Sequence, residues 1–234
     1  MFISLKKALV FAAAASICLF AAGCGNSSDS ASSSSSKDAN KEITVGVTPG
    51  FHADVMEQVK KEAAKQGILI KVIEFSDYVT PDVALSNKEI DMNSYQHKPY
   101  MDNMVKDKGL KLVSIGQTVV APIGLYSHKI KSLDELKDGA VVAIPNDPTN
   151  GARGLLLLQK AGLIKVKDGV KYPTPADVAE NPKHLQFREL EAAQIPRSLD
   201  DVDLAAVNTN YALEAGIDPV KDALFREDKD SPYA

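Results

Sequence analysis

The stretch from Ile144 to Arg153 combines residue types that suit an anion-binding site. It leaves an apolar, β-rich segment, passes through Asn, Asp, Pro and Thr, which cap and turn, and enters the first turn of a predicted helix. Free backbone N–H groups and the helix dipole attract an anion at such a terminus. Arg153 is unexpected there, because the positive end of the helix dipole disfavours a cation unless an anion lies between the two. Its guanidinium matches a carboxylate, and the alternative is a solvated arginine or one paired with a structural Asp.

A second stretch, residues 91–100, holds two tyrosines, a histidine and several amides directly after a short apolar run. Aromatic faces suit a thioether, because polarizable sulfur gains roughly 0.3 to 1.5 kcal/mol from ring contact. Tyr and His side chains near a loop are often half-buried for structural reasons alone. A structural role therefore stays open for Tyr95 and His97. Asn208 follows another apolar run and could accept a hydrogen bond from an ammonium group, or it is an ordinary turn residue.

No pattern of catalytic or metal-binding residues accompanies these candidates. The histidines at positions 52, 97, 128 and 184 are scattered, and the sequence contains no HExxH, GxSxG, GxGxxG or Walker motif. We therefore expect no enzyme activity, no metal and no cofactor; a hydrolase site assembled from distant loops is the alternative. A formal charge of −4 argues against a basic nucleic-acid binder, and 44% hydrophobic residues argue against a disordered acidic chain.

The first 23 residues have the layout of an export signal. Two lysines precede an apolar run over residues 8–22, which at about fifteen residues is too short for a membrane-spanning helix. Small residues then precede Cys24, in a pattern that resembles the bacterial lipobox with an alanine where leucine is more usual. We predict a signal peptide over 1–23, a lipid anchor on Cys24 and a Ser-rich disordered tether over 24–40. A plain secretory signal with an incidental cysteine is the alternative.

Strand and helix patterns alternate through the rest of the chain, which predicts the α/β class without deciding the sheet order. Strands are expected at residues 43–47, 68–75, 140–144 and 204–207, and helices at 52–66, 149–161 and 209–215. In the first helix Val55, Val59 and Ala63 lie four apart, which predicts one buried face. Glycines 67, 162 and 216 follow the three helices as expected stops.

Three further helix starts are expected from capping residues. Thr80-Pro81 and Thr174-Pro175 each place a hydroxyl before a proline at the first helical position, and Ser132 with Glu135 fits a capping box.

Five motifs occur in order over residues 41–234: Asp77-Tyr78, Tyr95-Gln96-His97-Lys98-Pro99-Tyr100, Pro145-Asn146-Asp147-Pro148-Thr149-Asn150, Pro196-Arg197-Ser198-Leu199-Asp200-Asp201 and Glu227-Asp228-Lys229-Asp230-Ser231-Pro232-Tyr233. Together they resemble the methionine-binding lipoprotein family, also called the NlpA family. The resemblance implies a two-lobed periplasmic-binding-protein fold, type II-like, with the ligand cleft between the lobes. It implies a first lobe of about 41–120 plus the residues after about 208, and a second lobe of about 121–207.

The resemblance also implies a role for each candidate residue. Arg153 would hold the ligand carboxylate, with Asn150 in the same site, and Asn208 would hold the amino group. The implied side-chain pocket consists of Tyr78, Tyr95 and His97. Tyr95 stands where the family is expected to carry phenylalanine, and its added hydroxyl needs a partner if it is buried.

The implied function is that of a lipid-anchored solute-binding protein on the extracytoplasmic face of the cell membrane. It would deliver methionine, as either enantiomer or as a short methionyl peptide, to the permease and ATPase of an ABC importer, with no nucleic-acid partner. Binding would close the lobes by a hinge motion. A surface-anchored adhesin and an extracytoplasmic hydrolase are the alternatives. The chain stops at Ala234, before a second asparagine and the last helices of the family pattern, and we interpret it as a fragment.

Overall fold

The computed structural model describes residues 42–228 and Tyr233, which lie in one unit of the chain, residues 38–234. The expected signal peptide, the Cys24 anchor and the tether lie outside the described residues. Within the described part, no helix is both long enough and apolar enough to cross a membrane.

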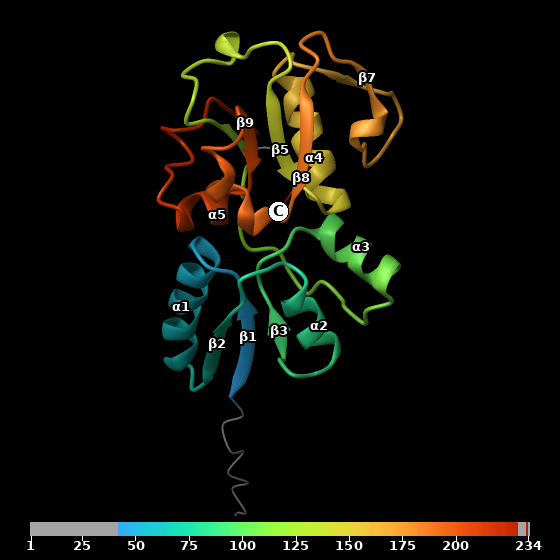
Figure 1. The fold of residues 1–234 in the computed structure, drawn as a ribbon. Helices are drawn as coiled ribbons and strands as arrows, with labels where there is room; N and C mark the ends of the chain where they lie inside the picture. The colour runs from blue at the N-terminus through green and yellow to red at the C-terminus, as the bar shows by residue number, and fades with distance from the viewer. Residues whose placement is uncertain (1–41, 229–232, 234) are drawn as a thin grey trace, which may run out of the picture. The chain divides into compact units, whose positions relative to one another are not determined.

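A parallel three-stranded sheet forms from the first strands of the described chain, in the order β2-β1-β3 (Figure 1). Its strands are β1 (Ile43–Val47), β2 (Ile70–Glu74) and β3 (Met92–Asn93), and the connecting helices are α1 (Phe51–Ala64) and α2 (Thr80–Ser86). Val45 of the central strand lies opposite Val72 on one side and Met92 on the other. The strand–helix–strand unit expected at the start of the body is confirmed.

Helix α1 buries a different face from the one that its sequence pattern predicted. Met56 is the buried residue of this helix, and it belongs to the same hydrophobic cluster as Val45 and Val47 of β1. Val59, one of the three residues expected inside, is 42% exposed. The four-residue spacing identified a stripe but not the rotation of the helix, and the long Met56 side chain is the one that reaches the sheet.

A mixed five-stranded sheet carries most of the hydrophobic core, in the order β10-β4-β9-β5-β8. Its strands are β4 (Gly124–Tyr126), β5 (Val141–Pro145), β8 (Gln186–Leu190), β9 (Leu204–Val207) and β10 (Phe225–Arg226). β5 runs parallel to β8 and β9, whereas β4 runs antiparallel to β9 and β10. The strands predicted at 140–144 and 204–207 are confirmed as β5, shifted by one residue, and β9.

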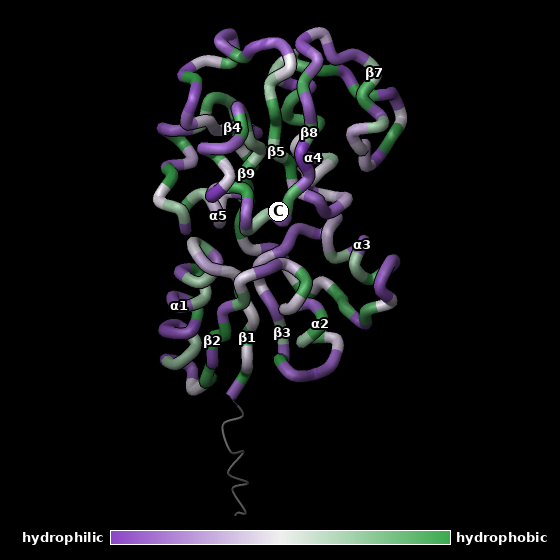
Figure 2. The backbone as a smooth tube through the Cα atoms, in the orientation of Figure 1, coloured by the Kyte–Doolittle hydropathy of each residue, from purple (hydrophilic) through white to green (hydrophobic). Residues whose placement is uncertain are grey.

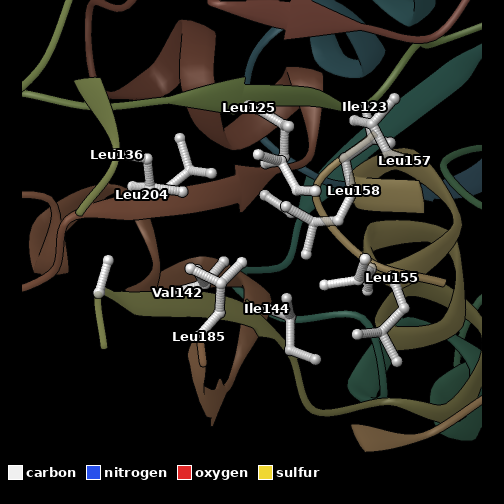
Figure 3. Close-up of a cluster of buried hydrophobic side chains, with 14 of the residues drawn as sticks. Ile123, Leu125, Leu136, Val142, Ile144, Leu155, Leu157, Leu158, Leu185 and Leu204 are labelled. Atoms are coloured by element: carbon white, nitrogen blue, oxygen red, sulfur yellow. The ribbon is translucent and has the colours of Figure 1, made fainter. Parts of the chain in front are cut away.

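Helix α4 (Pro148–Lys160) is held against this sheet by a row of leucines. Leu155 and Leu158 are fully buried in one cluster with Ile144 and Leu204 of the sheet (Figure 3). Much of β5 and β9 is accordingly hydrophobic (Figure 2). Because each buried leucine contributes roughly 1.5 to 3 kcal/mol, this cluster fixes where the start of α4 lies relative to the ends of the strands.

The helices predicted at 149–161 and 209–215 are confirmed as α4 and α5 (Thr209–Glu214). Gly162 and Gly216 follow them with φ values of 76° and 77°, the left-handed conformation that ends a helix at little cost for glycine. The remaining elements are α3 (Lys98–Lys108), the strand pair β6 (Lys165–Val166) and β7 (Val178–Glu180), and short 3₁₀ turns, two of which are η3 (Ala192–Gln194) and η4 (Pro196–Ser198).

The three predicted helix starts are partly wrong. Helix α2 begins at Thr80, with Val79 and not Thr80 at the N-cap. Asp77 satisfies the N–H groups there, because its Oδ1 accepts hydrogen bonds from Val79 and Thr80 at 2.7 and 2.8 Å. Ser132 and Thr174 do cap helical turns, yet each turn is a single 3₁₀ turn. These turns are η1 (Leu133–Glu135) and η2 (Pro175–Asp177). Capping residues mark where a turn starts, whereas its length depends on packing beyond the first turn.

The last described segments join the five-stranded sheet. Tyr211 and Ala212 of α5 belong to a cluster with Val207 of β9, and β10 pairs with β4. Both elements lie beyond about residue 208, the point after which the resemblance implied that the chain returns to the first lobe.

The strands β2, β3, β5 and β9 each end at a segment that carries a candidate residue. β1 is parallel to β2 and β3, and β5 is parallel to β8 and β9, so within each sheet these ends point the same way. Crevices outside the carboxyl ends of parallel strands are where α/β folds bind ligands. The topology therefore gathers residues that are far apart in the sequence.

Candidate functional site

A cavity of about 550 Å³ lies where these strand ends meet. Its lining includes all six candidates, which are Tyr78, Tyr95, His97, Asn150, Arg153 and Asn208. It also includes apolar side chains from α1 and from the segment between α3 and β4, among them Met56, Leu112 and Val119. The size falls within the range of small-molecule sites. A polar end and an apolar wall in one cavity suit a ligand that is itself part charged and part apolar.

The anion at the start of α4 is supplied by the protein. Asp147 is the N-cap of this helix, and its Oδ1 accepts hydrogen bonds from the N–H groups of Thr149 and Asn150 at 3.1 and 2.9 Å. The expectation that free N–H groups at this terminus bind an anion is therefore wrong, because a carboxylate already occupies them. Arg153 lies in the second turn of α4 and not in the first.

Arg153 is buried, with only 3% of its side chain exposed, and Glu227 holds one edge of its guanidinium. Its Nε donates to Oε1 of Glu227 at 2.7 Å, and its Nη2 donates to Oε2 of Glu227 and to the carbonyl of Ala121. The guanidinium also stacks 4.4 Å from the ring centre of Tyr233. These contacts fix the plane of the guanidinium. No hydrogen bond joins Nη1 to another residue in the described part of the chain.

Asn150 is the centre of a hydrogen-bond network beside Arg153. Its Nδ2 donates to Oδ2 of Asp147 at 2.9 Å, which fixes the orientation of the amide. Its Oδ1 then faces two donors, Nε2 of His97 at 3.1 Å and Nδ2 of Asn208 at 2.9 Å. The network joins three strand ends, because His97 follows β3, Asn150 follows β5 and Asn208 follows β9.

His97 is neutral and its tautomer is set by its neighbours. Its Nδ1 accepts from the N–H of Tyr100 at 3.1 Å, so the ring proton is on Nε2 and points to Asn150. Burial lowers the pKa of His97 to about 4, and the charge of Arg153 lowers it further. Arg153 therefore faces no second cation from this residue at neutral pH.

Asn208 has an acceptor that nothing in the described residues uses. Its Nδ2 is bonded to Asn150, which orients the amide and leaves Oδ1 buried without a hydrogen-bond partner. An unsatisfied buried acceptor costs about 1 to 3 kcal/mol. A ligand that brings a hydrogen-bond donor to this oxygen would remove that cost.

Three of the tyrosines in this region form an aromatic wall, defined here as Tyr78, Tyr95 and Tyr100. Their ring centres are 5.9 to 6.5 Å apart. The hydroxyl of Tyr78 donates to Oδ1 of Asn210 at 2.6 Å, and that of Tyr95 donates to the carbonyl of Tyr78 at 2.5 Å. Burial raises the pKa of both hydroxyls, so they stay protonated. The Tyr95 hydroxyl thus has the partner that its burial requires.

Sequence reasoning missed several residues of the site. Glu227 and Tyr233 occur in one of the quoted motifs, but no local pattern linked them to Arg153, 74 residues before Glu227. Asn210 was overlooked although it stands two residues after Asn208, at the same strand end. His52 lines the cavity as well, and burial lowers the pKa of its ring to about 4. In the described residues no group of His, Cys, Asp and Glu side chains is placed to hold a metal ion.

The chain is similar to proteins of known family and structure. A family model described as NlpA lipoprotein matches residues 43–234. The D-methionine-binding lipoprotein MetQ of Salmonella typhi is 56% identical over 216 residues, which is 91% of this chain and 76% of that protein.

Solved structures of similar proteins share the fold, as two examples show. A periplasmic substrate-binding protein of an ABC transporter from Coxiella burnetii superposes with a TM-score of 0.80 at 50% identity, covering 82% of each chain. A nutrient-binding protein from Burkholderia cenocepacia, bound to methionine, superposes with a TM-score of 0.80 at 51% identity, also covering 82% of each chain.

Proposed function

Because the chain belongs to the NlpA lipoprotein family, we propose that it is a solute-binding protein that captures methionine and delivers it to an ABC importer. Its α/β fold is that of the matched substrate-binding proteins of ABC transporters, as the sequence suggested. Those relatives bind a cargo and are not enzymes. The work of this site is then recognition, and no covalent step is assigned to any of its residues.

The unpaired Oδ1 of Asn208 is the observation that carries the proposal. It lies in the same cavity as Arg153, so one acceptor and one cation are available to a single small ligand. An amino acid brings an ammonium group for the acceptor and a carboxylate for the cation. Both charged groups would be removed from water, and each gains a charge-assisted hydrogen bond.

The aromatic wall supplies the specificity for the side chain. Rings of Tyr78 and Tyr95 present polarizable faces, and Met56 adds a thioether of the protein to the same lining. A methionine sulfur would gain roughly 0.3 to 1.5 kcal/mol from contact with the rings. A side chain with a charge would have to give up its hydration against this apolar surface, which disfavours it.

Calorimetric titration of the ligand-free protein tests this assignment. We expect binding of L- or D-methionine, and much weaker binding of N-acetylmethionine, because acetylation removes the ammonium group that Asn208 would accept from. Norleucine, which replaces the sulfur by a methylene, should bind less tightly than methionine. Equal affinity for methionine and its N-acetyl derivative would show that the ammonium group is not read by this site.

The anchor and the transporter complete the proposal. The relatives are lipoproteins by name, and we infer that a lipid on Cys24 holds this protein at the extracytoplasmic face of the membrane, near the permease and ATPase that receive the cargo. Cys24→Ala should release the protein from membranes and abolish incorporation of labelled palmitate. Incorporation that persists in this variant would refute the anchor.

A further inference from the structure

One carboxyl group behind the aromatic wall is buried without a cation. Asp82, in the first turn of α2, has no exposed surface, and it does not line the cavity. Among the described residues, no Lys, Arg or His forms an ion pair with it. Burying an isolated carboxylate costs free energy, so something other than a cation must stabilise Asp82 in this position.

One oxygen of Asp82 fastens the segment between β3 and α3. Its Oδ1 accepts from Nδ2 of Asn93 at 2.8 Å and from Nε2 of Gln96 at 2.5 Å. Asn93 and Gln96 flank Tyr95, and His97 follows directly. Asp82 therefore acts on two residues of the site through their neighbours along the chain.

The other oxygen of Asp82 has no donor among the described residues. Its Oδ2 is buried without a hydrogen-bond partner in this part of the chain, and the hydroxyl of Tyr95 is near enough for the two groups to perturb each other's pKa. That hydroxyl has a single proton, which it donates to the carbonyl of Tyr78 at 2.5 Å. Its oxygen is then only an acceptor, and an ionised Asp82 would face it acceptor to acceptor.

A proton on Asp82 resolves this conflict. Protonated Asp82 has one O–H donor for the oxygen of Tyr95 while its other oxygen still accepts from both amides. Burial raises the pKa of Asp82 to about 6, and the hydrogen bonds from Asn93 and Gln96 limit the rise.

We propose that Asp82 is a positioning residue that donates its carboxyl proton to the Tyr95 hydroxyl and so sets the spacing of the aromatic wall that recognises the ligand side chain. The chain of bonds runs from Asp82 through Tyr95 to the backbone of Tyr78. The proposal rests on the proposed function, because it assigns these rings to the methionine side chain. Tyr95 stands where phenylalanine was expected, so the chain has a hydroxyl that can make this connection.

Two substitutions at Asp82 separate the protonated carboxyl from a merely space-filling side chain. Asp82→Asn keeps one acceptor and places an N–H donor where the proton would be. At pH 5, where Asp82 is protonated, it should therefore bind methionine within about threefold of the unchanged protein. Asp82→Leu has similar size but no polar atom, and should lose at least roughly tenfold in affinity. Tyr95→Phe should lose several-fold, because the wall keeps its rings but not the bond to Tyr78. Asp102→Asn, at an exposed carboxyl of α3, is the matched control and should change nothing.

Carbon NMR of the Asp82 carboxyl gives a readout that needs no ligand. We expect the carboxyl of the full chain to be protonated at pH 5, where an exposed Asp is ionised, and to ionise more easily in Tyr95→Phe. A carboxyl that titrates like an exposed Asp, or an Asp82→Asn variant as weak as Asp82→Leu, would overturn the proposal. If Asp82→Leu does not fold, the comparison of Asp82→Asn with Tyr95→Phe and the NMR titration still decide it. If methionine binds to none of the proteins, the proposed function fails, and the NMR result stands separately.

Discussion

Replacing Arg153 by alanine should reduce both methionine affinity and stability, by amounts that the contacts of this residue allow us to estimate. Its side chain is 3% exposed and its partner Glu227 is 13% exposed, so the pair is shielded from water. Breaking a buried pair by removing one partner costs about 3 to 5 kcal/mol, since Glu227 would be left as an uncompensated charge. The carbonyl of Ala121 would also lose its donor.

The loss of affinity has a separate origin. An enclosed ligand carboxylate that loses its charged partner costs roughly 2 to 5 kcal/mol, which corresponds to a reduction from about 30-fold to several thousandfold. Lys160→Ala is the matched control, because Lys160 is on the same helix and pairs with Asp228, the residue after Glu227. Its pair is exposed, at 53% and 70%, so the variant should lose less than about 1 kcal/mol of stability and no affinity.

Urea unfolding and calorimetric titration with methionine measure the two effects independently. The titrations must be made where Arg153→Ala is still folded, which the unfolding curves establish. Unchanged affinity together with lower stability would refute the reasoning for the ligand, because Arg153 would then serve only to hold Glu227. Unchanged stability would contradict the buried pair itself.

The remaining predictions concern proton linkage and close packing. Burial raises the pKa of Asp82 from 3.8 to about 6. Between these two pH values the folded state keeps a proton that the unfolded chain releases. The stability that is present below pH 4 is therefore lost as the pH rises to 6. Asp82→Asn does not titrate, so in urea unfolding it should exceed the unchanged protein by roughly 3 kcal/mol at pH 7, with no difference near pH 3; a constant difference would contradict the shift. Gly151→Ala should lose about 1 to 3 kcal/mol, because its Cβ would lie 2.6 Å from the carbonyl oxygen of Pro145. Gly116→Ala, which adds a methyl group to open space, should stay within about 0.5 kcal/mol, and equal melting temperatures for the two variants would argue against the clash.

Local patterns in the sequence determined most of the elements and the fold class. The strands β1 and β9 match their predicted bounds, because alternating or continuous apolar runs depend on the side chains of the run alone. Gly162 and Gly216 mark the ends of α4 and α5 for a similar local reason. The places of Arg153 and Asn208 beside a helix start and a strand end, together with the motifs that resemble the NlpA family, were sufficient to identify the six candidate residues, all of which line one cavity.

Only the tertiary structure decided which atoms of these residues are used. Arg153 meets Glu227 across 74 positions, and Asn208 meets Asn150 across 58, so no local spacing encodes either contact. The orientation of an amide depends on which neighbour takes its donor, and for Asn208 that neighbour leaves the oxygen unpaired.

Burial was decided in the same way. The rotation of α1 that buries Met56 and exposes Val59 follows from the packing of the helix on β1, not from its own periodicity. Asp82 is an ordinary acidic residue in the first turn of a helix by its sequence, and it is the surrounding chain that removes it from water and raises its pKa. Secondary structure is specified by neighbours in the chain, whereas solvation, charge state and hydrogen-bond partners are properties of neighbours in space.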